Sequence, residues 1–332
     1  MNTETLDQPI VADVAVSAPA VVIESAAPAV AAVAEGPNPF TALGLDAALV
    51  RAVSDLGYTQ PTEVQAKAIP LAMGSGKADE ASIDLMVSSQ TGSGKTAAFL
   101  LPVLNTLIAQ KAIEAAAEQA EFERQRAQAA ASGEAAPKRA KRKNPMQSRN
   151  FKAAVPGALV LCPTRELAQQ VAQDAIELVK HCKNLRVANV VGGMPYQLQI
   201  AKLQNADLVV ATPGRLLDLQ RSLQIKLDKV QFLVVDEADR MLDLGFADDL
   251  EEVHQMTAQR KQTMMFSATF APRIQQLAMR VMHDGGANVQ KITIATPQQG
   301  HDNIQQKLYW ADHAQHKRKL LDHWLRDTTI NQ

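Results

Sequence analysis

The sequence predicts an α/β fold: a mostly parallel sheet with helices on both faces. Short apolar runs recur along the chain, and most are followed by a small or polar turn and then by a helical pattern. Hydrophobic residues make up 46% of the chain and aromatic residues only 4%, which suits a core of Val, Leu, Ile and Met. Ligands of such sheets bind beyond the carboxyl ends of the strands. The predicted strands are Leu85–Val87, Ala158–Cys162, Val187–Val191, Leu208–Ala211, Phe232–Val235 and Thr263–Phe266.

Two helices are predicted before the first strand. Apolar residues over 40–56 recur at helical spacing, and Gly57 provides a stop. A second helix follows Thr62 and ends at Pro70. Residues 1–36 are rich in Ala, Val, Pro and Ser and nearly lack large side chains, which predicts a disordered tail.

A segment over about residues 108–150 interrupts the alternation of strands and helices. Its first part consists mainly of Ala, Glu, Gln and Arg, which favour a helix. A basic run over 137–143 and then Arg149 follow. Two interpretations stay open: a solvated helical arm with a basic loop, or an auxiliary nucleic-acid clamp, because clustered Lys and Arg neutralise phosphates.

Composition excludes several classes of protein. The net charge of -1 does not indicate a nucleic-acid partner, so such binding has to come from local basic groups and backbone amides. The two cysteines, Cys162 and Cys182, form neither a disulfide framework nor a zinc site. No apolar stretch approaches the ~18 residues of a membrane span. The N-terminus lacks a basic start before an apolar core, so we expect a cytoplasmic, reducing setting.

The segment Ser89–Thr96 has the strongest functional signal. It reads Ser-Gln-Thr-Gly-Ser-Gly-Lys-Thr between an apolar run and a helical pattern. Its glycines let successive N–H groups point at phosphate oxygens, and the following helix adds the positive end of its dipole. Lys95 can reach the β and γ phosphates, and the Thr96 hydroxyl can bind Mg²⁺. Although Ser89 replaces the usual first Gly, the context favours nucleotide binding over an ordinary Gly-rich turn.

Two adjacent carboxylates, Asp236 and Glu237, follow the predicted strand Phe232–Val235. A Mg-nucleotide site needs one carboxylate to hold the metal, usually through water, and another to orient the attacking water. Asp236 suits the first role and Glu237 the second. An acidic cluster after a strand is by itself most often a helix cap. Together with the Lys95 loop, it predicts a Walker-type ATPase.

Residues 236–239 read Asp-Glu-Ala-Asp, and with the segments around them the chain resembles the DEAD-box RNA helicases over about residues 40–280. The resemblance implies a RecA-like P-loop NTPase domain, which we place at residues 37–290. It also implies ATP and Mg²⁺ as cofactors and RNA as the partner. The catalytic residues implied are Lys95, Asp236, Glu237, Ser267 and Thr269.

The segment Gly57–Gln65 is similar to the family's adenine-binding motif. In the family, the equivalent of Gln65 hydrogen-bonds the adenine edge, and an upstream aromatic, here Phe40, packs on the base. Glu63 and Val64 stand where many members have Pro and Ile. The nucleotide site implied consists of Phe40, Tyr58, Gln65, Thr91, Gly92, Ser93, Gly94, Lys95 and Thr96, with the metal at Thr96 and Asp236.

Three further segments, each after a predicted strand, resemble the parts of the family that grip the RNA sugar-phosphate backbone. Their arginines supply charge and their glycines expose N–H groups, so binding should not depend on sequence. Read singly, Thr164 could cap a helix and residues 212–215 could form a tight turn. Their joint occurrence in the family's order favours RNA. The residues are Pro163, Thr164, Arg165, Gly192, Gly193, Thr212, Pro213, Gly214 and Arg215.

The segment Ser267–Thr269, in the family, links the acid pair to unwinding through hydroxyl hydrogen bonds. Residues 291–332 resemble a linker and the incomplete start of a second RecA-like domain, with a strand at Ile304–Ala311 and a helix at Lys317–Leu325. The family activity expected is ATP-dependent unwinding or remodelling of RNA duplexes. This chain by itself is expected to be nearly inactive, because the second domain's arginines are missing.

Two other functions are alternatives to the helicase. The alternative is a non-catalytic RNA-binding module that uses ATP as a switch. An unrelated phosphate-loop ATPase, such as a transporter motor, would leave Gln65, Arg165 and Arg215 without a purpose. Adenine selectivity and salt-sensitive binding of single-stranded RNA separate these readings.

Overall fold

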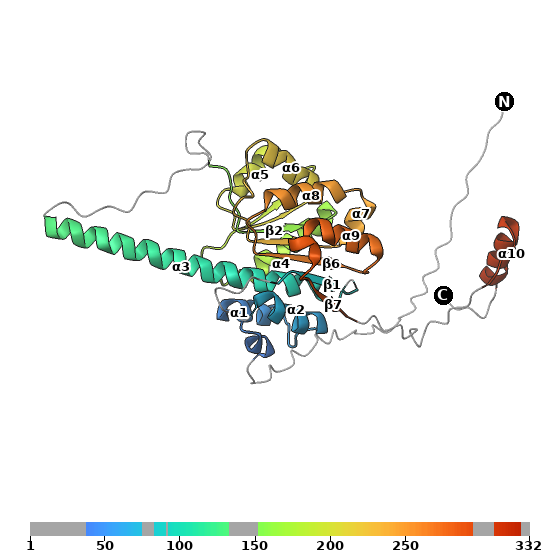
Figure 1. Cartoon of the computed structure of the whole chain (residues 1–332). Helices are drawn as coiled ribbons and strands as arrows, with labels where there is room; N and C mark the ends of the chain where they lie inside the picture. The colour runs from blue at the N-terminus through green and yellow to red at the C-terminus, as the bar shows by residue number, and fades with distance from the viewer. Residues whose placement is uncertain (1–37, 75–82, 91, 133–151, 295–308, 327–332) are drawn as a thin grey trace, which may run out of the picture. The chain divides into compact units, whose positions relative to one another are not determined.

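The computed structural model describes residues 38–74, 83–90, 92–132, 152–294 and 309–326. Within these residues a seven-stranded sheet has the order β3-β4-β2-β5-β6-β1-β7, and all neighbouring strands are parallel (Figure 1). The predicted α/β fold is therefore confirmed. The strands are β1 (Leu85–Ser88), β2 (Ala158–Leu161), β3 (Val187–Val190), β4 (Leu208–Ala211), β5 (Phe232–Val235), β6 (Gln262–Ser267) and β7 (Gln290–Thr293).

Helices cover both faces of this sheet. Their bounds are η1 (Pro39–Leu43), α1 (Ala47–Asp55), α2 (Glu63–Met73), α3 (Lys95–Ser132), α4 (Arg165–Leu178), α5 (Tyr196–Leu203), α6 (Pro213–Arg221), α7 (Ala238–Asp243), α8 (Ala247–Met256), α9 (Pro272–Val281), η3 (His283–Gly286) and α10 (Ala314–Leu325). Side chains of each strand alternate between two cores. In β2, Ala158 and Val160 enter the core packed by α1 to α4, whereas Leu159 and Leu161 enter the core packed by α5 to α9. Because both faces are buried, the inner strands read as continuous apolar runs.

The seventh strand, β7, was not predicted. It pairs with β1 alone, and of its four residues only Ile292 is buried. An edge strand of this kind gives a weak apolar signal. Because β7 spans the predicted domain boundary at residue 290, the sheet of the first domain extends to Thr293.

Two helix predictions are corrected. The helix expected over 40–56 is divided, because Gly44 adopts a φ of 76° and Asp46 caps α1 by accepting from the Ala48 N–H at 2.8 Å. Pro70 does not end α2, which continues to Met73. A proline in the last turn removes one backbone donor, and the residues after it still form the helix.

Helix α3 contains the helical part of the segment predicted as an insertion. It is one helix of 38 residues that begins at Lys95, and its residues as far as Leu107 pack in the core. By length and composition α3 could cross a membrane. Half of its most apolar 18-residue stretch is buried inside the fold, so core packing accounts for the apolar residues. The basic run at 137–143 lies outside the described residues, as does the tail at 1–36.

The last described segment contains α10, which confirms the helix predicted over Lys317–Leu325. No residue of α10 is buried. Most of the strand predicted at Ile304–Ala311 falls outside the described residues. Both cysteines are free, and Cys162 is fully buried at the end of β2. Burial, followed by the charges of Asp236 and Glu237, raises the pKa of the Cys162 thiol well above its usual value.

Candidate active site

The polar segments that follow the strands lie along one edge of the sheet. Ser88 of β1 pairs in register with Ser267 of β6, and β5 lies on the other side of β6. Because all three strands are parallel, their carboxyl ends share an edge. The loop that starts at Ser89 and the acid pair that starts at Asp236 therefore flank the end of β6, the arrangement that the ATPase prediction requires.

The phosphate loop has the backbone shape that its glycines allow. Gly92 and Gly94 have φ values of 78° and 88°, in the left-handed region that favours glycine. Lys95 and Thr96 form the first turn of α3, so the positive end of the helix dipole faces the loop. Thr91 lies outside the described residues.

Serine and lysine side chains hold this loop closed. Ser93 Oγ donates to the Gln90 carbonyl oxygen at 2.8 Å and lies 3.0 Å from Ser89 Oγ. The buried Lys95 donates from Nζ to the Ser89 carbonyl oxygen at 3.2 Å. An entering phosphate has to replace that carbonyl as the acceptor for Lys95. Ser89, which departs from the usual first Gly, thus takes part in the loop through both its hydroxyl and its carbonyl.

Asp236 is the most strongly perturbed carboxyl of the site. It is 3% exposed, and its Oδ1 accepts from the Glu237 N–H at 3.0 Å. Burial raises the pKa of Asp236 to about 6, against the attraction of Lys95, which lowers it. A carboxylate so far from water needs a cation close by. This environment fits a Mg²⁺ ion, which Asp236 would hold with the Thr96 hydroxyl as the second oxygen donor.

Glu237 has an unusual backbone conformation. Its φ of 50° and ψ of 54° are left-handed, which costs a non-glycine residue about 1–3 kcal/mol. The strained residue directly precedes α7, and one carboxylate oxygen lies 3.5 Å from Arg240 Nη1. The strained turn moves the Glu237 side chain out of the alternating pattern of β5, next to Asp236 at the sheet edge.

A hydrogen bond from a backbone amide to a carboxylate joins the segments around Ala268 and Asp239. Asp239 Oδ2 accepts from the Ala268 N–H at 3.3 Å. The Ser267 hydroxyl accepts from the Thr269 N–H at 3.4 Å, and Ser267 is 1% exposed. This described contact uses a backbone amide and the last acid of residues 236–239, and the link expected through the hydroxyls of Ser267 and Thr269 stays a prediction. Sequence reasoning missed Asp239, since no spacing rule pairs it with residue 268.

Gln65 lies against the phosphate loop. Its Nε2 donates to the Gly94 carbonyl oxygen at 3.1 Å, and its Oε1 accepts from the Thr62 N–H at 3.0 Å. The Thr62 hydroxyl in turn accepts from the Gln65 N–H, which completes a capping box at the start of α2. One amide hydrogen and one lone pair of Gln65 remain available, enough for the adenine contact that the family resemblance implies.

The two aromatic residues predicted to contact adenine are neighbours that differ in exposure. Phe40 is 0% exposed within the core, so no part of its ring is open to a base in this structure, and the predicted adenine contact stays a prediction. The Tyr58 ring is 41% exposed and lies 6.5 Å from Phe40 between ring centroids. Burial, followed by the charges of Asp174 and Glu177, raises the pKa of Tyr58. Tyr58 therefore lies near α4 rather than on the phosphate loop.

Arg165 and the glycine pair lie together beyond the ends of β2 and β3. Arg165 Nη1 is 3.5 Å from the Gly192 carbonyl oxygen, and a side chain at Gly193 would collide with the same guanidinium. Thr164 caps α4 by accepting from the Leu167 N–H at 3.3 Å, so the cap interpretation also holds. Pro163, which precedes this cap, is buried. The exposed guanidinium and peptide edge can bind a phosphodiester.

The segment after β4 begins α6. The Thr212 N–H donates to the Val190 carbonyl oxygen at 3.1 Å, and Pro213 occupies the first helical turn. Gly214 is exposed, so its N–H lies at an open helix start. The Arg215 guanidinium lies 5.5 Å from the centre of the Tyr196 ring, which holds it in place. Sequence reasoning did not find Tyr196, because its role depends on α5 packing near α6.

A comparison with protein families decides the identity of this domain. The model described as DEAD/DEAH box helicase matches residues 62–277. The chain belongs to the DEAD-box RNA helicase family. The parallel sheet is thus a RecA-like DEAD-box domain, and the family is one of ATPases, so ATP binding follows from membership.

Relatives from distant organisms support the same family. The chain is 39% identical to DEAD-box ATP-dependent RNA helicase 52A of Oryza sativa over 85% of its length, and 37% identical to ATP-dependent RNA helicase SrmB of Escherichia coli over 86%. It covers 42% and 54% of those two proteins, so it spans about half the length of the curated relatives it matches.

Solved structures agree with the fold. A hypothetical ATP-dependent RNA helicase from Sulfolobus tokodaii matches with a TM-score of 0.56 and 32% identity, over 75% of this chain and 57% of that one. A DEAD box protein from Methanococcus jannaschii matches with a TM-score of 0.56 and 30% identity, over 77% and 55%.

Proposed function

We propose that this protein is an ATP-dependent RNA helicase that binds Mg-ATP and the backbone of single-stranded RNA, and so unwinds or remodels RNA duplexes. The observation that carries the proposal is that Lys95 and Asp236 meet at one sheet edge. Gln65 is bound to the same loop, at Gly94. A cation, a buried carboxylate and an adenine-reading amide around one glycine-rich loop suit a Mg-adenosine triphosphate.

The protein side chains have separate tasks at this edge. Lys95 and the backbone amides that start α3 bind the phosphates, and Asp236 balances the charge of a cation. Asp236 and the Thr96 hydroxyl would hold a Mg²⁺ ion, which would neutralise negative charge on the phosphates. Glu237, on its strained turn, orients the attacking water. The Asp239–Ala268 hydrogen bond connects residues 236–239 to the end of β6. A displacement of the acid segment therefore also displaces the segment that starts at Ser267.

RNA binding is assigned to the ends of β2, β3 and β4. Arg165, the Gly192-Gly193 peptide and Arg215 supply charges and N–H groups to a phosphodiester backbone. None of them is placed to read a base in a duplex groove, so affinity should be independent of sequence. The relatives named RNA helicases support this assignment.

The proposal is tested by binding and then by turnover. ATP should displace a fluorescent adenine nucleotide whereas GTP should not, and RNA of any sequence should bind with strong salt dependence. RNA-stimulated phosphate release, however slow, that disappears in Glu237→Gln supports the ATPase. Nucleotide-dependent RNA binding with no release in either protein would instead favour the non-catalytic module. Failure to distinguish ATP from GTP would contradict the assigned role of Gln65.

A further inference from the structure

Exposed cations gather at the sheet edge opposite the nucleotide site. We call this the amino-edge surface, because its residues precede the strands: Lys152, Arg186, Lys226, Lys229 and Lys261. Their loops adjoin. The Lys226 N–H donates to the Ala154 carbonyl oxygen at 2.8 Å, and the Lys261 N–H donates to that of Gln231 at 2.7 Å. Residue 154 lies four residues before β2 and residue 231 directly precedes β5, so these cations share one edge.

The charges of this surface are not balanced by acids. Among the described residues, none of its five cations forms an ion pair. By contrast, arginines on the helices α6 and α9 form ion pairs. Arg221 pairs with Glu252 at 2.8 Å, and Arg273 pairs with Asp243 at 2.7 Å. Of the acids nearby, Asp207 is held by Lys111 at 3.0 Å. Asp84, which precedes β1 at this edge, is buried and pairs with His283, and Glu114 pairs with Lys111. Glu118 and Asp228 are not paired with any of the five cations.

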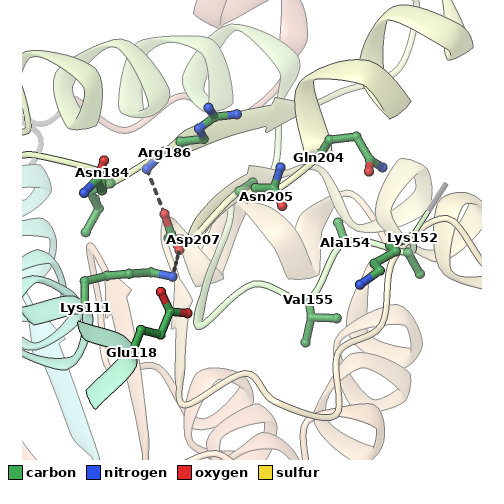
Figure 2. Close-up of a pocket in the computed structure, with 13 residues that line it drawn as sticks. Lys111, Glu118, Lys152, Ala154, Val155, Asn184, Arg186, Gln204, Asn205 and Asp207 are labelled. Atoms are coloured by element: carbon green, nitrogen blue, oxygen red, sulfur yellow. Dashed lines mark hydrogen bonds and ion pairs between the residues drawn. The ribbon is translucent and has the colours of Figure 1, made fainter. Parts of the chain in front are cut away.

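A cavity of about 1040 Å³ opens within this surface, between the middle of α3 and the starts of β2, β3 and β4 (Figure 2). Lys152 and Arg186 line it, together with the amides of Asn184 and Asn205. Figure 2 shows Lys111 and Glu118 on one side of the cavity and Lys152 on the other. The cations and amide donors of this hollow suit phosphate oxygens and ribose hydroxyls. Its two acids are Asp207, which pairs with Lys111, and Glu118.

The amino-edge surface lies at the other ends of the strands assigned to RNA. Arg165 follows β2 and Gly193 follows β3, whereas Lys152 and Arg186 precede those same strands. A strand of four residues is about 13 Å long, so a polynucleotide can reach both ends. From β3 to β6 the surface spans four strand spacings, about 19 Å, which is room for several phosphates.

We propose that the amino-edge surface binds the phosphodiester backbone of RNA that extends beyond the carboxyl-edge site. The inference rests on the proposed function, since it assigns the same ligand a second contact area. Binding there is electrostatic and independent of sequence. It lengthens the RNA footprint without touching the nucleotide pocket, and helps the domain to hold long or structured RNA.

The test compares two RNAs on two double variants. The first variant, Lys152→Gln with Arg186→Gln, removes two charges at the cavity. The matched control, Arg51→Gln with Lys67→Gln, removes two exposed charges on α1 and α2. Fluorescence anisotropy would be measured against salt with RNAs of about eight and about thirty nucleotides. The basic run at 137–143 stays unchanged in both.

The first variant should bind the longer RNA on the order of tenfold more weakly near 0.1 M salt, and its salt slope should fall by about 1.4, since each lost single-strand phosphate contact is worth about 0.7. Binding of the shorter RNA and of ATP should match wild type, and the control should match wild type throughout. Equal affinity of both variants for the longer RNA would overturn the inference. Failure of the wild type to bind either RNA would instead overturn the proposed function.

Discussion

The Gln65 side chain is hydrogen-bonded to the main chain of Gly94, with 3.1 Å between Nε2 and the carbonyl oxygen. A residue implicated in reading adenine is therefore part of the support of the phosphate loop. A contact between adenine and the free side of the Gln65 amide would therefore be coupled to the position of the phosphate loop, which the same amide contacts at Gly94.

Gln65→Ala should weaken ATP binding about tenfold and abolish selectivity over GTP, because one polar contact to the base and one to the loop are lost. Loss of the capping box should lower the free energy of unfolding by about 1 kcal/mol. Gln65→Glu is the control, since it can keep the cap but cannot donate to Gly94. Competition binding and urea unfolding separate the two effects. Retained selectivity in Gln65→Ala would rule out the adenine contact.

Gly94→Ala and Gly92→Ala should differ. Both glycines have positive φ, but an added Cβ at Gly94 would lie 2.5 Å from Gln65 Nε2, whereas at Gly92 it would meet nothing within 4 Å. Gly94→Ala should therefore eliminate detectable ATP binding, while Gly92→Ala should reduce it less, through backbone strain alone. Isothermal titration with Mg-ATP measures both. Equal losses would show that only the backbone conformation matters.

Mg-ATP binding should weaken as the pH falls through about 6, because the pKa of Asp236 is raised to about 6 and the protonated form cannot balance a cation. Titration of wild type and Asp236→Asn between neutral pH and pH 5 checks this. The variant should bind weakly and lack the pH dependence. A wild-type profile that is flat across this range would contradict the assignment.

The same shift predicts that Asp236→Asn stabilises the nucleotide-free protein at neutral pH. The folded pKa lies above the unfolded value of 3.8, so the stability present at low pH is lost as pH rises from about 4 to about 6. Removing the buried charge should recover up to about 3 kcal/mol at neutral pH. Chemical unfolding at neutral pH and at pH 4 tests the sign. The gain should be largest at neutral pH, and an equal gain at pH 4 would point to another cause.

Arg165→Ala should weaken RNA binding by about the same factor for every RNA sequence, since Arg165 is placed to contact backbone and not bases. Gly193→Ala should act in the same direction, because the added side chain would displace the Arg165 guanidinium from its place beside the glycines. Filter binding with unrelated RNAs measures this. Arg51→Ala on α1 serves as the control. A loss confined to one sequence would indicate base reading instead.

The five inner strands could be predicted because burial on both faces makes them continuous apolar runs. The edge strand β7 could not, because only Ile292 of its residues is buried. The lysine of the phosphate loop and the Asp236-Glu237 pair were recognised because their residue types and local context are dictated by phosphate and metal chemistry. The burial of Phe40 was missed, since periodicity does not tell whether an aromatic side chain faces a ligand or the core.

The sequence by itself determined the parallel sheet, the phosphate loop and the family to which the chain belongs, because each depends on local residue types and their spacing. The tertiary structure decided which residues meet across long separations. Asp239 reaches Ala268 because β5 and β6 pair in the sheet, and Gln65 reaches Gly94 because α2 packs against α3. Lys152 shares an edge with Lys261 because all strands of the sheet are parallel. Spacing along the chain cannot encode such contacts, since they arise when distant segments are buried against one another.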